Sequence, residues 1–210
     1  MSSANRTVFI VDDDSSICSS LSRLVRSIGL QAQAFTSAEE FMDARPVTSR
    51  EPACLLLDLH MPGIGGLELQ RELSTDPASC PIIFISGNGD IPLTVRAMKQ
   101  GAVTFLSKPF EDDDLLQSIN EALERHRCLL ESASQVDAIR EQIAGLTDRE
   151  AEVMGWVITG ALNKQIAAHL GIAEKTVKVH RGRVMEKMRV TTVAELVRIC
   201  VTARFELAGK

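Results

Sequence analysis

The chain has 210 residues, 45% of them hydrophobic, and carries a formal net charge of -5 at pH 7. This length can hold two ordinary domains with hydrophobic cores, so we expect a globular protein rather than a disordered one. No hydrophobic run approaches the roughly 18 residues that a membrane span requires. Residues 1–7 are too short and polar for a secretory signal. We therefore expect a cytoplasmic protein without a membrane partner.

The five cysteines are widely spaced, and none forms a CxxC pair. Zinc sites and redox centres usually show such pairs, and an odd number does not suit a framework of disulfide bonds. We interpret the following residues as buried free thiols: Cys18, Cys54, Cys80, Cys128 and Cys200.

Short apolar runs alternate with helical patterns in the first part of the chain. The strands are predicted at Thr7–Val11, Leu30–Phe35, Cys54–Asp58, Pro81–Ser86 and Ala102–Leu106. The helices are predicted from Ser15 to Ile28, at Ala38–Ala44, around Leu67–Leu73, at Ile91–Gln100 and from Leu115 onward, with a polar loop at Arg45–Pro52. This alternation predicts an α/β fold with a doubly wound, five-stranded parallel sheet.

Polar side chains follow the predicted strands where each one ends: Asp12 with Asp13, then Asp58, Ser86 and Lys108. A lone Asp after a strand is usually a turn former or a helix N-cap, but here three carboxylates would converge and repel one another. A hard cation such as Mg2+ relieves that repulsion, and Lys108 can neutralise the remaining charge. Ser86 can donate to a phosphoryl oxygen, which leaves Asp58 free to act as a nucleophile on phosphorus.

A long segment without proline or glycine runs from Asp112 to Ala144, and its composition favours a helix throughout. One heptad line along it is apolar and a second is only half apolar. The first line is Ala122, Leu129, Val136 and Ile143, and the second is Arg125, Ser132, Ile139 and Leu146. The segment is either a partly coiled-coil helix or, as the polar second line favours, a solvated connector.

The charge differs between the two parts of the chain. Residues 1–128 hold 18 acidic and 11 basic residues, whereas residues 129–210 hold 10 acidic and 12 basic ones. The basic residues are concentrated between Asn163 and Arg189. This asymmetry indicates two domains with different partners.

Four further helices are predicted, at Leu146–Met154, Asn163–Leu170, Glu174–Met188 and Thr192–Thr202. Thr147 and Glu150 have the spacing of a capping box. A short helix, a tight turn at Gly171 and a longer basic helix predict a helix-turn-helix. The basic residues of the longer helix are Lys175, Lys178, Arg181 and Arg183, and they can neutralise DNA phosphates or reach guanine edges. For a basic helix alone, an ordinary solvated surface is the alternative.

The segments VDDD, LLLDLHMPG, FISG and FLSKPF stand in this order at the predicted strand ends. Over residues 5–128 the chain thereby resembles the receiver domain of two-component response regulators, which has a flavodoxin/CheY-like fold. The resemblance implies that Asp58 accepts a phosphoryl group from a sensor histidine kinase. It also implies a Mg2+ site at which Asp13 and Asp58 bind the metal, Asp12 assists through water and the backbone carbonyl of His60 is a further ligand.

The same resemblance implies that Lys108 pairs with the phosphoryl group and is joined to Pro109 by a cis bond. Ser86 and Phe105 would form a switch pair, although Phe105 would also serve as an ordinary core residue. Gly65 stands where the family often has a capping side chain, so the next helix is expected to start loosely.

The segments LTDREAEV, NKQIAAHLGIAEKTVKVHRGRVMEKM and TTVAELV resemble the LuxR-type helix-turn-helix domain. The resemblance implies that Thr176 contacts phosphate and that Lys178 and Val179 face the bases, with Val179 against a thymine methyl group. Gly182 lies where some members carry a base-reading lysine, so we expect fewer direct base contacts.

These expectations combine into a receiver domain at residues 5–128, a helical linker at 129–145 and an all-α, four-helix LuxR-type domain at 146–210. The chain is identified as a member of the FixJ-like branch of the NarL family. Phosphorylation of Asp58 would favour a homodimer that binds promoter DNA and acts with RNA polymerase, as an activator more than as a repressor. It would not be an enzyme beyond its own phosphorylation and dephosphorylation.

Two alternatives stay open. One is a DNA-binding regulator that does not depend on phosphorylation. The other is a phosphatase with Asp12 as its nucleophile, which the DxD spacing permits but which needs a cap domain that this chain lacks.

Overall fold

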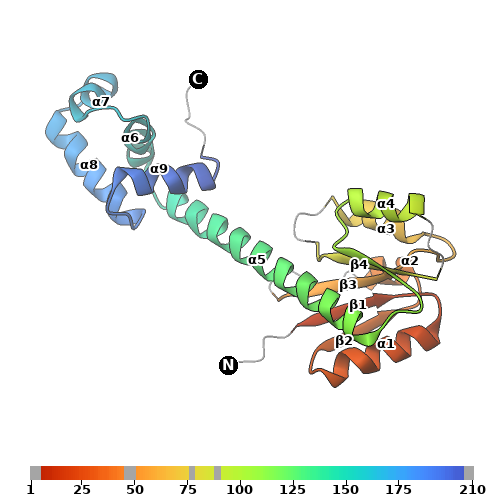
Figure 1. Cartoon of the computed structure of the whole chain (residues 1–210). Helices are drawn as coiled ribbons and strands as arrows, with labels where there is room; N and C mark the ends of the chain where they lie inside the picture. Colours follow the sequence, from red (N-terminus) through yellow and green to blue (C-terminus); the bar gives the residue numbers. More distant parts are fainter. Residues whose placement is uncertain (1–5, 45–50, 76–78, 88–90, 206–210) are drawn as a thin grey trace. The chain divides into compact units, whose positions relative to one another are not determined.

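The computed structural model describes residues 6–44, 51–75, 79–87 and 91–205 of the chain (Figure 1). The chain divides into two compact units, Met1–Glu131 and Ser132–Lys210. Most of the predicted polar loop at Arg45–Pro52 lies outside the described residues, as do residues 1–5 and 206–210 at the two ends.

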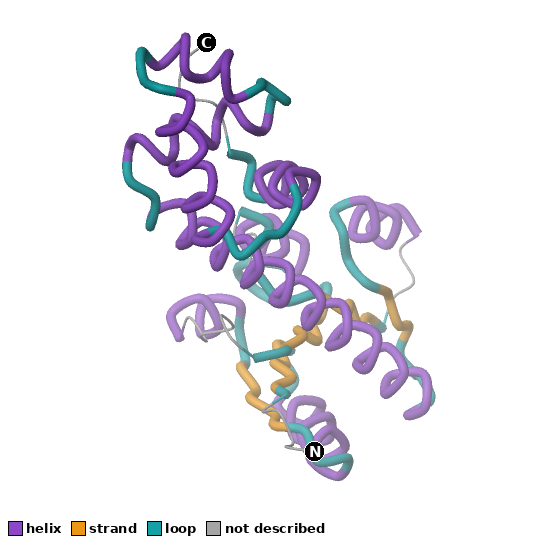
Figure 2. The backbone as a smooth tube through the Cα atoms, turned by 90° about the vertical axis from the view of Figure 1, so that its left-hand side faces the viewer, coloured by secondary structure: helices purple, strands orange, loops and turns teal. Residues whose placement is uncertain are grey.

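The first unit is built on a parallel sheet with the strand order β2-β1-β3-β4-β5. Its strands are β1 (Thr7–Val11), β2 (Gln31–Phe35), β3 (Ala53–Asp58), β4 (Ile82–Ser86) and β5 (Thr104–Ser107). Its helices are α1 (Ser15–Ser27), α2 (Ala38–Ala44), α3 (Gly66–Leu73), α4 (Ile91–Lys99) and the start of α5 (Asp112–Ala144). Figure 2 shows helices around the strands. The doubly wound sheet predicted from the alternating pattern is confirmed.

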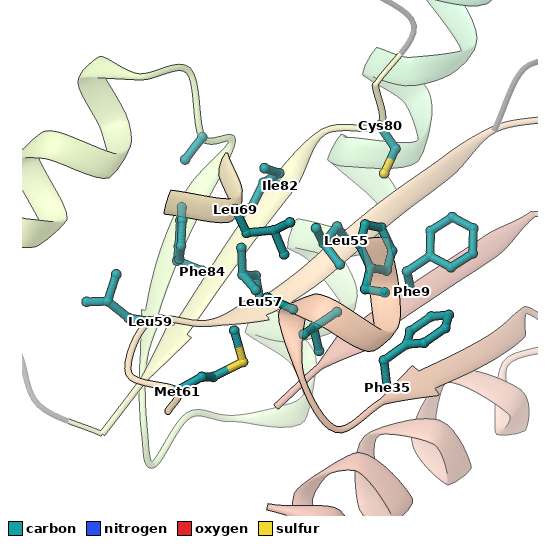
Figure 3. Packing of buried hydrophobic residues seen from close by; sticks show 14 of the residues in the cluster. Phe9, Phe35, Leu55, Leu57, Leu59, Met61, Leu69, Cys80, Ile82 and Phe84 are labelled. Carbon is teal, nitrogen blue, oxygen red and sulfur yellow. The ribbon is translucent and has the colours of Figure 1, made fainter. Parts of the chain in front are cut away.

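Each face of the sheet carries its own hydrophobic core, because successive residues of a strand point to opposite faces. One core, shown in Figure 3, joins the strands to α2, α3 and α4 through Phe9, Leu55, Leu57, Phe84, Phe41, Leu69 and Ala97. The other joins them to α1 and α5 through Val8, Ile10, Leu56, Ile83, Leu21, Val25, Leu115 and Ile119. Burial on both faces explains why Cys54–Leu57 is an unbroken apolar run that ends at Asp58.

The last strand begins later than predicted. The apolar run predicted a strand at Ala102–Leu106, whereas β5 covers Thr104–Ser107. The Ala102 N–H donates to the carbonyl of Ala97, 3.2 Å away, so this residue still closes the end of α4 and does not pair with β4. The shift extends the strand through Ser107, directly before Lys108.

The second unit is all-helical, as predicted. It contains the end of α5 followed by α6 (Asp148–Ile158), α7 (Asn163–Leu170), α8 (Glu174–Lys187) and α9 (Val193–Thr202). Its core comprises Val153, Met154, Val157, Ile166, Val177, Val184, Met188, Leu196 and Cys200. Ile139 and Ile143 of α5 pack against this core. The capping box of Thr147 and Glu150 is present, and Gly171 ends α7 with a left-handed φ of 63°.

All five cysteines are free thiols, and the prediction of burial is correct for four of them. It is wrong for Cys128, which is exposed. The buried stripe of α5 runs through Ala122, Leu123 and His126, and Cys128 lies off it. Within the described part of the chain, no helix is both long and apolar enough to span a membrane.

Candidate functional site

The sheet register gathers the predicted polar residues at the carboxyl edge of β1, β3, β4 and β5. Val11 pairs with Leu57, so Asp12 and Asp58 are the next residues on neighbouring strands. Ser86 pairs with Ser107, and Lys108 follows it. The strand order changes direction between β1 and β3, which is where doubly wound sheets bind their ligands.

Lys108 joins the two buried carboxylates of this edge. Its Nζ lies 2.7 Å from Oδ2 of Asp12 and 2.8 Å from Oδ1 of Asp58. The side chains of Asp12 and Asp58 are only 4% and 9% exposed. Burial by itself would lower the pKa of Lys108, but the hydrogen bonds to Asp12 and Asp58 outweigh it and raise that pKa above its usual value. The ammonium group therefore stays charged and offsets the repulsion between the carboxylates.

The second oxygen of each carboxylate accepts a backbone hydrogen bond. Oδ2 of Asp58 accepts from the N–H of His60 at 2.7 Å, and Oδ1 of Asp12 accepts from the N–H of Asp14 at 2.9 Å. Both carboxylates are thus fixed in orientation by the loops that follow their own strands. Asp13, between Asp12 and Asp14, is exposed.

Two glycines shape the loop that follows Asp58. A Cβ atom on Gly66 would lie 2.3 Å from the carbonyl oxygen of Asp58 and 3.0 Å from the ring of Phe84. Gly63 has a φ of +75°, and a Cβ there would lie 2.6 Å from Oε1 of Glu39. Glycine is therefore required at position 66 by the close approach of its backbone to the strand end.

Glu39 of α2 also contacts this loop, which the sequence analysis missed. Its Oε1 accepts a hydrogen bond of 3.1 Å from the N–H of Ile64. This bond joins α2 to the segment between Asp58 and α3. Nothing in the sequence distinguishes Glu39 from its neighbour Glu40, because the contact depends on how α2 packs against the sheet. Gly65, as expected, gives α3 no side-chain cap.

Ser86 and Phe105 lie on neighbouring strands close to the same edge. Ser86 is fully buried, and its carbonyl accepts a hydrogen bond of 2.7 Å from the N–H of Lys108. Phe105 pairs with Phe84 and packs, partly buried, against the core of Figure 3. The peptide bond between Lys108 and Pro109 is cis.

The donor chemistry at this edge suits a hard cation. Asp12, Asp13 and Asp58 all offer carboxylate oxygen, which Mg2+ prefers. Lys108 lies between two of these carboxylates. Among the described residues, no group of three or more His, Cys, Asp or Glu side chains is arranged to hold a metal ion.

The second candidate surface is the exposed side of α8. Val177 and Val184 face the core, and the following residues lie on the exposed side: Lys175, Thr176, Lys178, Val179, Gly182 and Arg183. Val179 is an exposed apolar residue among these basic ones, with 48% of its surface accessible. A Cβ atom on Gly182 would meet nothing within 4 Å.

Arg181 differs from the other predicted contact residues of α8. It is half-buried, and its Nη1 donates a hydrogen bond of 3.1 Å to Oδ1 of Asn163, the first residue of α7. This bond braces the two helices of the helix-turn-helix against each other.

Comparison with known families identifies both units. Residues 8–120 match the family described as response regulator receiver domain, and residues 144–200 match bacterial regulatory proteins, luxR family. The chain belongs to the response regulator family. It combines a receiver domain with a LuxR-type DNA-binding domain, as the motifs predicted, and is a transcriptional regulator of a two-component system.

Similar response regulators align with nearly the whole chain. Nodulation protein W of Bradyrhizobium diazoefficiens is 48% identical over 202 residues, which cover 95% of this chain and 87% of that protein. Response regulator protein TodT of Pseudomonas putida is 44% identical over 199 residues, with the same coverage of 95% and 87%. The solved structure of response regulator StyR is 43% identical, covers 94% of this chain and 99% of its own, and superimposes with a TM-score of 0.82.

Proposed function

We propose that this response regulator accepts a phosphoryl group on Asp58 and then binds promoter DNA through α8. The observation that carries the proposal is the environment of Asp58. One of its oxygens is 2.8 Å from the Lys108 ammonium, and the other accepts the His60 N–H. A carboxylate held in this way is oriented for attack, and a cation is already present to pair with the phosphoryl group that it receives.

The phosphoryl donor would be a phosphohistidine of a sensor histidine kinase. An oxygen of Asp58 forms a bond to phosphorus while the bond from phosphorus to the histidine nitrogen breaks, and the product is an acyl phosphate. Lys108 then pairs with the phosphoryl oxygens, and the hydroxyl of Ser86 donates to one of them. Phe105, on the strand beside Ser86, would change its packing in response.

Mg2+ would be held by the carboxylates of Asp13 and Asp58 and by the backbone carbonyl of His60, with Asp12 assisting through water. When bound, it supplies positive charge that stabilises the transferring phosphoryl group. The support for this site is the chemistry of these residues, since carboxylate and carbonyl oxygens are the ligands that Mg2+ prefers.

The output surface would be the exposed side of α8. We assign Lys175, Thr176 and Arg183 to phosphate contacts, Lys178 to base edges, and Val179 to a thymine methyl group. Arg181 uses one of its five N–H donors on Asn163, and its other donors would reach a DNA phosphate.

Dimerisation would complete the response. A homodimer can set two copies of α8 in successive major grooves and so combine the affinities of two half-sites. We propose that the bound dimer activates transcription with RNA polymerase in the cytoplasm. The proposed division is a receiver at 5–128, a linker at 129–145 and a DNA-binding domain at 146–210. The packing of Ile139 and Ile143 against the C-terminal core favours counting the last part of the linker with the DNA-binding domain.

Phosphoryl uptake tests the receiver chemistry directly. The protein is incubated with Mg2+ and acetyl phosphate, and the added mass is followed by intact-mass spectrometry. Wild type is expected to take up one phosphoryl group and Asp58→Asn none. Asp14→Asn is a matched control, because Asp14 is an exposed N-cap of α1 that contacts neither Lys108 nor Asp58 in the hydrogen bonds described.

The same experiment distinguishes the alternatives. Uptake that persists in Asp58→Ala and disappears in Asp12→Ala would favour the phosphatase reading. Normal uptake on Asp58 without any change in DNA binding would favour a regulator whose output does not depend on phosphorylation.

A further inference from the structure

The last residue of α8 holds the segment at which α5 ends. Nζ of Lys187 donates to the carbonyl oxygen of Gly145 at 3.0 Å and to Oε2 of Glu150 at 2.7 Å. Gly145 directly follows α5, and Glu150 lies in the first turn of α6. One ammonium group therefore connects three helices of the DNA-binding unit.

The ion pair between Lys187 and Glu150 is strengthened by the burial of the Glu150 carboxylate. The Glu150 side chain is only 3% exposed, whereas that of Lys187 is 39% exposed. The same Oε2 accepts the N–H of Thr147 at 2.9 Å. The hydrogen bond from Lys187, followed by that from Thr147, lowers the pKa of Glu150 to about 2. Glu150 is thus a buried anion whose countercharge is supplied by α8.

The hydrogen bond from Lys187 to the Gly145 carbonyl is favourable because of its position at the end of a helix. The carbonyl groups at the C-terminus of a helix lack partners within the helix, and the helix dipole makes this end negative. The Lys187 ammonium satisfies one such carbonyl directly after α5. A displacement of the end of α5 within this unit must therefore move or break a bond to α8.

α5 begins in one unit and ends in the other. Its early residues Leu115, Ile119, Ala122 and Leu123 belong to the receiver core, and Ile139 and Ile143 pack against the core of the DNA-binding unit. The helix thereby connects the receiver core to Gly145.

We propose that Lys187 is a positioning residue that couples the end of α5 to α8, so that the response of DNA binding to phosphorylation depends on it. The inference rests on the proposed function, since it concerns how the receiver reaches the DNA-binding helix. Lys187 acts through Gly145 and Glu150, because its two bonds direct the ammonium toward them.

The test compares full-length variants on one promoter fragment, with and without Mg2+ and acetyl phosphate. Allosteric couplings typically change affinity about 5- to 150-fold. The affinity of wild type for the promoter fragment is expected to rise on phosphorylation by a factor within that range. Lys187→Met is expected to bind DNA equally in both states while taking up phosphate like wild type. Lys187→Arg, which can still donate to both acceptors, is expected to restore most of the response.

Lys175→Met is the matched control, because Lys175 is an exposed lysine near the other end of α8. Loss of one phosphate contact reduces the slope of log affinity against log salt by about 0.9. Lys175→Met should show this reduction once for each bound protomer and should keep the wild-type ratio of affinities between the two states. Lys187→Met should bind DNA with the same affinity in both phosphorylation states, and its slope of log affinity against log salt should equal that of wild type. A reduced slope in Lys187→Met would overturn the inference, because it would make Lys187 a DNA contact.

The outcomes separate the inference from the proposed function. If wild type itself does not tighten on phosphorylation, the proposed function fails. If phosphorylation raises the DNA affinity of wild type and of Lys187→Met by the same ratio, only the inference is overturned. Should Lys187→Met fail to fold, the double variant Lys187→Met/Glu150→Gln removes the ammonium without leaving Glu150 as an unpaired buried anion, and a full wild-type response in that variant would overturn the inference as well.

Discussion

At the residue scale, the strand end that carries Asp58 leaves no room for a side chain on Gly66. The nearest obstacle to a Cβ atom is the backbone oxygen of Asp58 itself, at 2.3 Å, and a backbone atom cannot move without displacing the carboxylate that it carries. Gly65 is different, because its Cβ would meet nothing closer than 3.9 Å. The two adjacent glycines thus make a matched pair.

Gly66→Ala is expected to destabilise the receiver by about 1–3 kcal/mol, the usual cost of inserting a methyl group into a packed site. It should also slow phosphoryl uptake, because Asp58 must shift. Gly65→Ala is expected to cost less, under about 1 kcal/mol, because Ala is a poorer N-cap of α3 than Gly, and to leave phosphoryl uptake unchanged. Urea denaturation and uptake from acetyl phosphate measure the two effects, and equal behaviour of the two variants would contradict the geometry described for Gly66.

Lys108→Met should destabilise the protein because it leaves the carboxylates of Asp12 and Asp58 buried without a countercharge. Breaking a buried ion pair typically costs about 3–5 kcal/mol, and the partial exposure of Lys108 places the expected loss at the lower end. Urea denaturation of Lys108→Met and wild type at neutral pH tests this, and equal stability of the two proteins would contradict the ion pairs described for Lys108.

At the element scale, the start of α6 depends on an ionised carboxylate. Glu150 has a pKa of about 2 in the folded protein, against a usual value of 4.5. A depressed pKa means that the ionised form stabilises the fold fully above pH 4.5 and that this contribution disappears as the pH falls toward 2. Glu150→Gln lacks this contribution at every pH.

The difference in stability between wild type and Glu150→Gln is therefore expected to be constant from neutral pH down to about pH 5 and to vanish toward pH 2. Chemical denaturation monitored by circular dichroism at a series of pH values measures it. A difference that persists unchanged at the lowest pH would mean that Glu150 acts through its shape and not through its charge.

Gly182 is a poor helix former inside α8. It lies within the helix with open space around its missing Cβ, and Ala is favoured over Gly inside a helix by about 0.5–1 kcal/mol. Gly182→Ala should therefore raise the melting temperature. Gly171→Ala is a contrasting change, because Gly171 has a φ of +63° that Ala adopts only with strain. If Gly182→Ala melts at or below the wild-type temperature, its surroundings are less open than described.

At the scale of the whole molecule, the sheet and its polar edge could be predicted because they follow from local patterns. Parallel strands end at one edge, so residues placed after strands, such as Asp12, Asp58 and Lys108, meet there whatever the details of packing. The exposed side of α8 was likewise predictable from its basic residues, Lys175, Lys178 and Arg183, which lie on that side.

Contacts that depend on how distant elements approach were not predictable. The bond from Ile64 to Glu39 needs α2 beside the loop after β3. The bond from the Ala53 N–H to Nδ1 of His126, at 2.8 Å, needs α5 beside the start of β3. The bond from Lys187 to Gly145 requires the C-terminal helices to be assembled. None of these pairs has a spacing or composition that marks it.

The most direct test of the account is the affinity of the full-length protein for a promoter fragment as a function of phosphorylation. Fluorescence anisotropy at fixed salt would compare wild type with Asp58→Asn, each with and without Mg2+ and acetyl phosphate. We expect that only wild type binds more tightly after treatment and that its complex then contains two protein chains. Equal affinity of the two proteins in every condition would contradict it, because phosphorylation of Asp58 would then not control DNA binding.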